Sequence, residues 1–482
     1  MPRCFETASF FCSFEGNSHI MRYLTIIVIF LISFSSLAQE DHPYIPETDP
    51  LVIEKLDQWQ DLKFGLLMHW GTYSQWGIVE SWSLCSEDEP WCTRKMKNYV
   101  DYCREYEKLK NTFNPTGFDP EQWARAAKEA GMKYVVFTTK HHDGFCMFDT
   151  RQTDYRITDA GCPFSVNPEA NVAKEIFDAF REEGFWTGAY FSKPDWHCND
   201  YWAEEWATPD RNVNYSIEKY PGRWQKYCDF TYNQIEELMS DYGEMDILWL
   251  DGGWVAPQNG QDINMAGIVE MARRHQPGLI VVDRAVGGKY ENYRTPEQHI
   301  PGELLDYPWE TCMTMAGSWS YVPNDRYKPT RKIIHLLADI VSKGGNYLLN
   351  IGPGPDGTWH DTAYIRLKEI GSWMALNGEA IYGSRPITPS GYENIRFTSN
   401  PDGTIYLIYL AGEDEVLMPE TVFVDGFQPS KGSVIELLGK KGKLKWSQEG
   451  TGFRIEIPAS MRKNPPCNYA WTFKVYMFNE DN

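Results

Sequence analysis

Five short apolar runs of the sequence each end in polar or aromatic residues. These ends read His69-Trp70-Gly71, Lys140-His141-His142-Asp143, Tyr190 with Asp195-Trp196-His197, Asp251-Gly252-Gly253-Trp254, and Asp283-Arg284. Carboxylates serve as nucleophiles or proton carriers, His and Arg donate to hydroxyl groups, and indole rings pack on the C–H faces of sugars. A single strand-end Asp often caps a helix, and a lone His often satisfies a core hydrogen bond. The convergence of five such ends predicts a sugar pocket.

The pair His141-His142 raises the question of a metal ion. Adjacent residues on a regular strand point to opposite faces, and a metal site also needs carboxylates or thiols in a matching geometry. No Cys pair has zinc-finger spacing, and no GxGxxG motif indicates a dinucleotide. We therefore expect no metal and no cofactor.

These strand ends have to be brought to one edge of a sheet. From about residue 50 to 385, apolar runs alternate with stretches of helical spacing: 120–130 precedes 132–138, and 331–342 precedes 346–351. Strands alternating with helices indicate parallel pairing, and the active site of such a barrel lies at the carboxyl ends of its strands. The length fits an α/β fold, a (β/α) TIM-like barrel over 39–388.

The remaining residues, 389–482, have a different pattern. Short alternating runs occur at 394–397, 404–410, 421–424, 433–438, 452–457 and 470–478, and the turn residues 400–403 (NPDG) separate the first two. This alternation predicts a C-terminal antiparallel β-sandwich.

The first 38 residues contain a secretory leader by pattern. Met21-Arg22 is a short basic start, 24–34 is apolar, and Ser36-Leu37-Ala38 offers small residues for cleavage. We expect Met21 to be the true start and the protein to be exported, to the periplasm or outside the cell. The apolar run is too short to span a membrane, so no integral membrane segment is expected in the mature chain.

Composition narrows the class of partner. The 482 residues carry a formal net charge of −21, which disfavours nucleic acid, because phosphate contacts need clustered Lys and Arg. Aromatic residues make up 15%, which suits stacking on sugar rings or an aromatic-rich core. Of 11 Cys, Cys4 and Cys12 precede the cleavage site, and the scattered remainder is no disulfide framework. Cys85, Cys92 and Cys103 lie close enough in sequence for one local disulfide bridge, and the sequence does not decide whether it forms.

Several sequence blocks resemble those of glycoside hydrolase family 29, the α-L-fucosidases. The blocks are 63–71 (KFGLLMHWG), 139–145 (TKHHDGF), 249–252 (WLDG), 282–284 (VDR) and 342–353 (SKGGNYLLNIGP). The resemblance implies a barrel followed by a β-sandwich, and removal of terminal α-L-fucose with retention, through a covalent intermediate and without a metal. Its substrate would be a fucosylated glycan or oligosaccharide.

The resemblance also implies site residues. The nucleophile of the family falls on Asp251. Residues that hold the fucose ring in similar enzymes match His69, His141, His142, Tyr190, Trp249 and Arg284. Glu80 and Trp82 match a Glu-Trp pair that reaches the sugar, although Ser81 interrupts the pattern here.

The general acid/base lies on a loop that varies within the family. Glu297 follows Arg284 on a predicted strand-end loop, and Glu310 begins the next segment. We prefer Glu297, because a Trp-Glu pair entering a strand suits a scaffold or ring contact. Glu303 is a remote third candidate.

Two other functions compete with an exo-acting fucosidase. An α-L-galactosidase would share the fold, since α-L-galactose adds only a hydroxyl at C6 and such a pocket need not reject it strongly. A non-catalytic carbohydrate-binding protein would keep the pocket without hydrolysis, although Asp251 and two acid candidates are present. The sequence leaves the fucosyl linkage and the oligomeric state open.

Overall fold

A computed structural model of the chain describes residues 42–85, 94, 96–203 and 210–476. The elements named below all belong to one compact unit, Pro43–Asn482. The expected leader and Cys92 lie outside the described residues. Within the described residues, no helix has the length and apolar character needed to cross a membrane.

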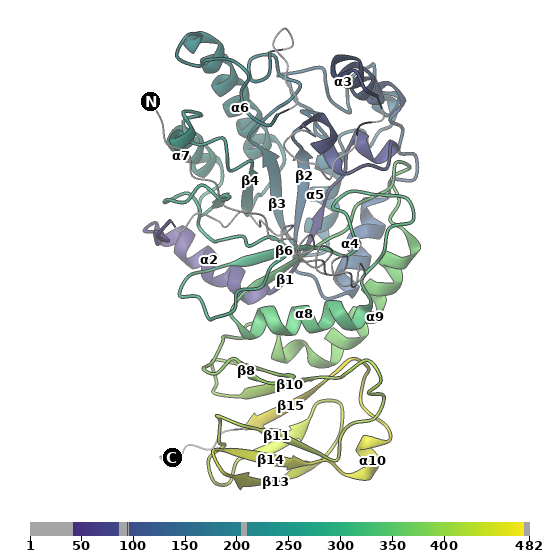
Figure 1. Ribbon diagram of the computed structural model, residues 1–482, viewed down its shortest axis with the longest axis vertical. Helices are drawn as coiled ribbons and strands as arrows, with labels where there is room; N and C mark the ends of the chain where they lie inside the picture. Colours follow the sequence, from purple (N-terminus) through teal and green to yellow (C-terminus); the bar gives the residue numbers. More distant parts are fainter. Residues whose placement is uncertain (1–41, 86–93, 95, 204–209, 477–482) are drawn as a thin grey trace, which may run out of the picture. The chain divides into compact units, whose positions relative to one another are not determined.

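Seven parallel strands form the first sheet (Figure 1). They are β1 (Phe64–Met68), β2 (Tyr134–Lys140), β3 (Trp186–Ser192), β4 (Ile247–Asp251), β5 (Ile280–Asp283), β6 (Glu310–Thr314) and β7 (Asn346–Asn350). Their order is β5-β4-β3-β2-β1-β7-β6, and nearly every strand residue is buried. Burial on both faces is expected of a parallel sheet covered by helices, and it explains why these segments read as continuous apolar runs.

Helices connect the strands and lie outside them (Figure 1). They are α2 (Pro50–Leu62), α3 (Tyr99–Glu107), α4 (Pro120–Glu129), α5 (Val172–Glu182), α6 (Pro221–Asp241), α7 (Met265–His275), α8 (Thr330–Ser342) and α9 (Asp361–Asn377). Short 3-10 turns include η1 (Thr72–Gln75), η2 (Glu80–Cys85), η3 (Lys108–Thr112), η4 (Pro163–Val166), η6 (Pro257–Asn259) and η7 (Gly378–Ala380). Asp49 and Asp119 cap α2 and α4 just before a proline, which fixes where each helix begins.

The sheet has no direct ladder between β5 and β6 in the described chain; an irregular segment, 291–298, lies between them. Glu291 forms an isolated bridge with Val282 of β5, and Glu297 forms one with Cys312 of β6. Arg294 is bridged to Trp309, just before β6. The segment therefore fills the place in the curled sheet where an eighth strand would stand. The strand beside it is β6, which the sequence did not predict because it contains no apolar run.

The C-terminal residues form an eight-stranded antiparallel sheet. Its strands are β8 (Gly391–Tyr392), β9 (Ile395–Ser399), β10 (Ile405–Leu410), β11 (Thr421–Val424), β12 (Val434–Leu437), β13 (Lys443–Glu449), β14 (Gly452–Glu456) and β15 (Ala470–Tyr476), with the short α10 (Ala459–Arg462) before β15. The order is β11-β14-β13-β12-β15-β10-β9-β8, and the inward side chains share one apolar core. The expected fold class, a TIM-like parallel β/α sheet followed by an antiparallel β domain, is confirmed. β13, with mostly exposed polar residues, was missed.

Candidate active site

Asp251 is the last residue of β4, and its carboxylate accepts three hydrogen bonds from neighbouring groups. Oδ1 accepts from the Gly252 backbone N–H at 2.8 Å and from Arg284 at 2.9 Å. Oδ2 accepts from the Tyr190 hydroxyl at 2.7 Å. Burial alone would raise the pKa of Asp251, but Arg284 and these hydrogen bonds outweigh it and hold the pKa well below its usual range. The side chain keeps 15% exposure, so the carboxylate is not fully closed off from solvent.

Arg284, directly after β5, links Asp251 to Glu297. Its second terminal nitrogen donates to the Glu297 carboxylate, while its guanidinium lies 5.2 Å from the centre of the Trp249 ring. Glu297 is exposed, with 42% of its side chain accessible, on the segment that completes the sheet. The structure thus brings one partly buried and one exposed carboxylate to a single guanidinium.

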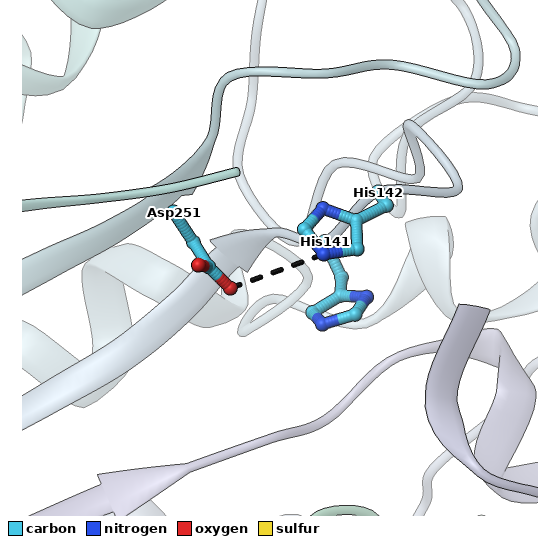
Figure 2. Close-up of side chains that lie close together, drawn as sticks. All are labelled: His141, His142 and Asp251. Carbon is cyan, nitrogen blue, oxygen red and sulfur yellow. Dashed lines mark ion pairs between the residues drawn. The ribbon is translucent and has the colours of Figure 1, made fainter. Parts of the chain in front are cut away.

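The three histidines matched from the sequence all lie near Asp251. The Nδ1 atom of each forms a hydrogen bond with a neighbouring polar side chain. His69 pairs with Asn350 at 2.8 Å, His141 with Ser81 at 2.6 Å and His142 with Ser192 at 2.6 Å. Figure 2 shows two of the rings beside the carboxylate; Nε2 of His142 lies 3.9 Å from Oδ2 of Asp251.

The expectation that His141 and His142 face opposite sides is wrong, because their ring centres lie only 4.3 Å apart. β2 ends at Lys140, and its register against β3 shifts just before, between Thr138 and Lys140. The alternation rule therefore no longer applies to the two residues that follow.

His141, His142 and Asp251 each offer one ligand atom, and these atoms lie within 4.8 Å of one another. A tetrahedral zinc with bonds of about 2.0–2.1 Å would hold its ligand atoms about 3.4 Å apart, closer than the 3.9 Å between His142 and Asp251. Arg284 also sits on the same carboxylate, where a cation would have to compete with it. The geometry suits a neutral polar ligand better than an ion.

Aromatic rings surround these polar groups. Tyr190 stacks on Trp249 with ring centres 5.2 Å apart, beneath Arg284. Trp82 and Trp254 approach His142 at 5.3 Å and 5.2 Å. Aromatic faces of this kind can cover the C–H patches of a sugar, and imidazole and guanidinium groups can form hydrogen bonds with hydroxyls.

Glu80 and Trp82 lie in different surroundings: Trp82 packs near His142, whereas Glu80 contacts Ser320. The Glu80 carboxyl is buried, and its Oε1 accepts from the Ser320 backbone N–H at 2.6 Å. Burial raises the pKa of Glu80 to about 8, since the hydrogen bonds from Ser320 offset only part of that cost. The intervening Ser81, which broke the family pattern, is the residue bonded to His141.

Glu310 is the first residue of β6, whereas Asp251 is the last residue of β4 in the same parallel sheet. Its carboxyl is fully buried and accepts from the Tyr134 hydroxyl at 2.6 Å and from Trp249 Nε1 at 3.3 Å. Burial raises its pKa to about 7. The structure therefore does not bring this acid candidate to the pocket mouth; it supports Trp249 from within the sheet.

Sequence reasoning missed the polar residues that orient the histidines. Ser192 and Asn350 end β3 and β7, and Ser81 lies in the short turn η2; no spacing rule ties any of them to a histidine far away in the chain. Trp319, whose ring lies 5.1 Å from His69, also gave no signal. Asn350 ends β7, so the rule that strand ends face the site would have found it.

The fold and this site define a glycoside hydrolase, and comparison with known proteins identifies the family. A family model described as alpha-L-fucosidase matches residues 31–379, and one described as the alpha-L-fucosidase C-terminal domain matches 389–476. The chain belongs to the α-L-fucosidase family, which confirms the resemblance drawn from its motifs.

Relatives agree over nearly the whole chain. The human tissue alpha-L-fucosidase is 29% identical over 94% of this chain and 96% of its own length. Among solved structures, alpha-L-fucosidase isoenzyme 1 from Paenibacillus thiaminolyticus matches with a TM-score of 0.73 and 29% identity, covering 89% of this chain and 100% of that one. The alpha-fucosidase of Thermotoga maritima, solved in complex with fucose, matches with a TM-score of 0.71 and 26% identity over 90% and 100% of the two chains.

Proposed function

We propose that this chain is an exo-acting, retaining α-L-fucosidase that works by double displacement, with Asp251 as nucleophile and Glu297 as acid/base. The observation that carries the proposal is the shared contact of both carboxylates with Arg284. Retaining glycosidases hold their two carboxyl groups about 5–5.5 Å apart, and one guanidinium that touches both is compatible with that spacing. The substrate is terminal α-L-fucose on a glycan or oligosaccharide, in keeping with relatives named as fucosidases.

The roles follow from the surroundings of each carboxylate. Asp251 stays ionised because of Arg284 and the Tyr190 hydroxyl, as attack on the anomeric carbon requires. Glu297 stands at the open edge, where it gives a proton to the departing oxygen and then takes one from the water that releases fucose. Neutral histidines and Trp249 position the sugar.

The acid/base assignment is tested with Glu297→Ala, and Glu310→Ala is the matched control. Glu297→Ala should lose most activity on fucosylated oligosaccharides but retain it on an aryl fucoside with a good leaving group, which needs no protonation. Added azide should speed the variant and give fucosyl azide, because azide replaces the water that Glu297 would activate. Glu310→Ala should lose activity on both substrates without azide rescue, since Trp249 loses its support. The opposite pattern would exchange the two roles.

We also propose export through the segment ending at Ala38. The support is the basic start, apolar run and small residues of the sequence alone. Mass spectrometry of the protein recovered from the periplasm or medium should find Gln39 as the first residue. An intracellular chain that retains its leader would refute export.

A further inference from the structure

The Nδ1 atoms of His69, His141 and His142 have different hydrogen-bond partners, and each partner determines which ring nitrogen carries the proton. Burial lowers the pKa of His69 and His142 to about 4 and that of His141 well below its usual value. Near neutral pH each ring is therefore uncharged, with one N–H donor and one lone pair. None of the three Nε2 atoms has a hydrogen-bond partner among the described residues, so the Nε2 atoms are left for a ligand.

His142 is fixed by Ser192. The Ser192 hydroxyl lies 2.7 Å from the Pro194 carbonyl oxygen, and two oxygens at that distance need a hydrogen between them. Ser192 has one hydroxyl hydrogen, so it donates to Pro194 and can only accept from His142 Nδ1, 2.6 Å away. Nδ1 therefore carries the proton, and Nε2 presents a lone pair.

His69 is fixed in the same sense by Asn350. The Asn350 amide nitrogen donates to the Trp319 carbonyl at 2.6 Å. The flipped amide would set oxygen against oxygen there, so Oδ1 must face His69 Nδ1 at 2.8 Å and accept from it. Nε2 of His69 is again a lone pair.

In His141 the other ring nitrogen, Nε2, carries the proton. Ser81 Oγ already accepts from the Asp143 backbone N–H at 3.1 Å, and Ser81 is fully buried. Its hydroxyl hydrogen needs an acceptor, and within the described chain the acceptor in reach is His141 Nδ1 at 2.6 Å. The proton of His141 therefore sits on Nε2, which donates.

We infer that the sugar pocket presents two imidazole acceptors and one imidazole donor, and so selects fucose whose facing hydroxyls are free. Ser81, Ser192 and Asn350 are the positioning residues that impose this pattern. The inference rests on the proposed function for the identity of the sugar. A hydroxyl that faces an acceptor must donate, so O-methyl, O-sulfate or fluorine there leaves a buried lone pair unmatched. A group that faces the donor needs only a lone pair.

The tautomers are measured directly on the whole chain without substrate. In nitrogen NMR spectra of protein labelled at histidine, His69 and His142 should carry hydrogen on Nδ1 and His141 on Nε2. His→Gln variants at each position assign the signals by their loss. Hydrogen on Nε2 of His142, or on Nδ1 of His141, would overturn the inference whether or not a fucoside is cleaved.

Competition measurements test the consequence. Deoxy and deoxyfluoro forms of L-fucose, altered at one ring hydroxyl at a time, should show two positions where fluorine binds about tenfold or more weaker than hydroxyl. Fluorine tolerated at every position would refute the pattern, whereas no binding of L-fucose itself would refute the proposed function instead.

Ser192→Ala should cut kcat/KM about 10–100-fold, the size of effect found when a metal-bound histidine loses its orienting partner, and should change the His142 signals. Ser192→Thr, which keeps the hydroxyl, should restore both. Unchanged His142 signals in Ser192→Ala would show that Ser192 does not set the tautomer.

Discussion

At the scale of the residue, the carboxylate of Asp251, the proposed nucleophile, is kept ionised by its neighbours. Three donors surround it: an arginine and a backbone N–H share Oδ1, and the Tyr190 hydroxyl meets Oδ2. The donor on Oδ2 is neutral, so this oxygen keeps more of its nucleophilic lone-pair density than Oδ1, which bears the guanidinium. Oδ2 is also the oxygen that faces His142. In the mechanism proposed above, we therefore assign bond formation to Oδ2.

Asp251→Asn should lower kcat by about a thousandfold or more, because an amide is a poor nucleophile and the covalent step is lost. The fold should survive, since the amide keeps one oxygen for Gly252 and Arg284 retains Glu297. Rates on an aryl α-L-fucoside and thermal unfolding test this, with the exposed Asp229→Asn as control. A variant retaining a tenth of the activity would exclude Asp251 as nucleophile.

Chelation should leave activity unchanged. The imidazole and carboxylate atoms of the pocket stand wider apart than a tetrahedral zinc requires, and Arg284 already neutralises the carboxylate. Prolonged EDTA treatment followed by dialysis and assay tests this. Loss of activity that zinc restores would return His141 and His142 to a ligand role.

At the scale of the element, the end of β4 depends on a glycine. Gly252 has φ +87°, and a Cβ there would lie 2.2 Å from the Pro194 ring in the loop after β3. Gly260, further along the same β4–α7 connection, has φ +70° but nothing within 4 Å of an added Cβ. An alanine at Gly260 would therefore cause backbone strain alone, whereas an alanine at Gly252 would cause strain and a steric clash.

Gly252→Ala should destabilise the protein by about 2–4 kcal/mol, from left-handed strain and the clash together. It should also lower kcat/KM by about a hundredfold, because a shift of an ångström at Asp251 misplaces the nucleophile. Gly260→Ala should cost only about 1–2 kcal/mol and spare activity. Denaturant unfolding and kinetics on both variants check this; equal effects would show that the contact with Pro194 is irrelevant.

The arrangement of strands also explains which parts of the site could be predicted from the sequence. Strand ends after apolar runs placed Asp251, Tyr190 and Arg284 correctly at one edge, because a parallel sheet brings its carboxyl ends together. Glu297 and Glu310 could not be ranked by spacing, since 291–298 is an irregular segment and β6 has no apolar signature. Only the fold shows that one faces the mouth and the other the interior.

At the scale of the whole molecule, burial of the pocket shifts several groups in opposing directions. Burial raises the pKa of Glu80 to about 8 and of Glu310 to about 7, and lowers that of His69 and His142 to about 4. The histidines make stability fall as pH drops below 6.5, because they become protonated in the unfolded chain while they stay neutral in the folded chain. The carboxyls make stability fall as pH rises above about 4.5, because the folded chain holds protons that the unfolded chain releases. Of these four groups, only Glu80 and Glu310 still change the stability above pH 6.5.

Glu80→Gln should therefore flatten the loss of stability between pH 6.5 and 8. The amide keeps an oxygen for the Ser320 N–H and never ionises, whereas wild-type Glu80 contributes a decline of up to about 1.4 kcal/mol per pH unit in this window. Relative to wild type, the variant should thus gain stability as pH rises towards 8. Denaturant unfolding at pH 5, 6.5 and 8 measures the difference, and Glu270→Gln, an exposed acid on α7, is the control. If the wild-type and Glu80→Gln curves run parallel across these pH values, Glu80 is already ionised in the folded protein.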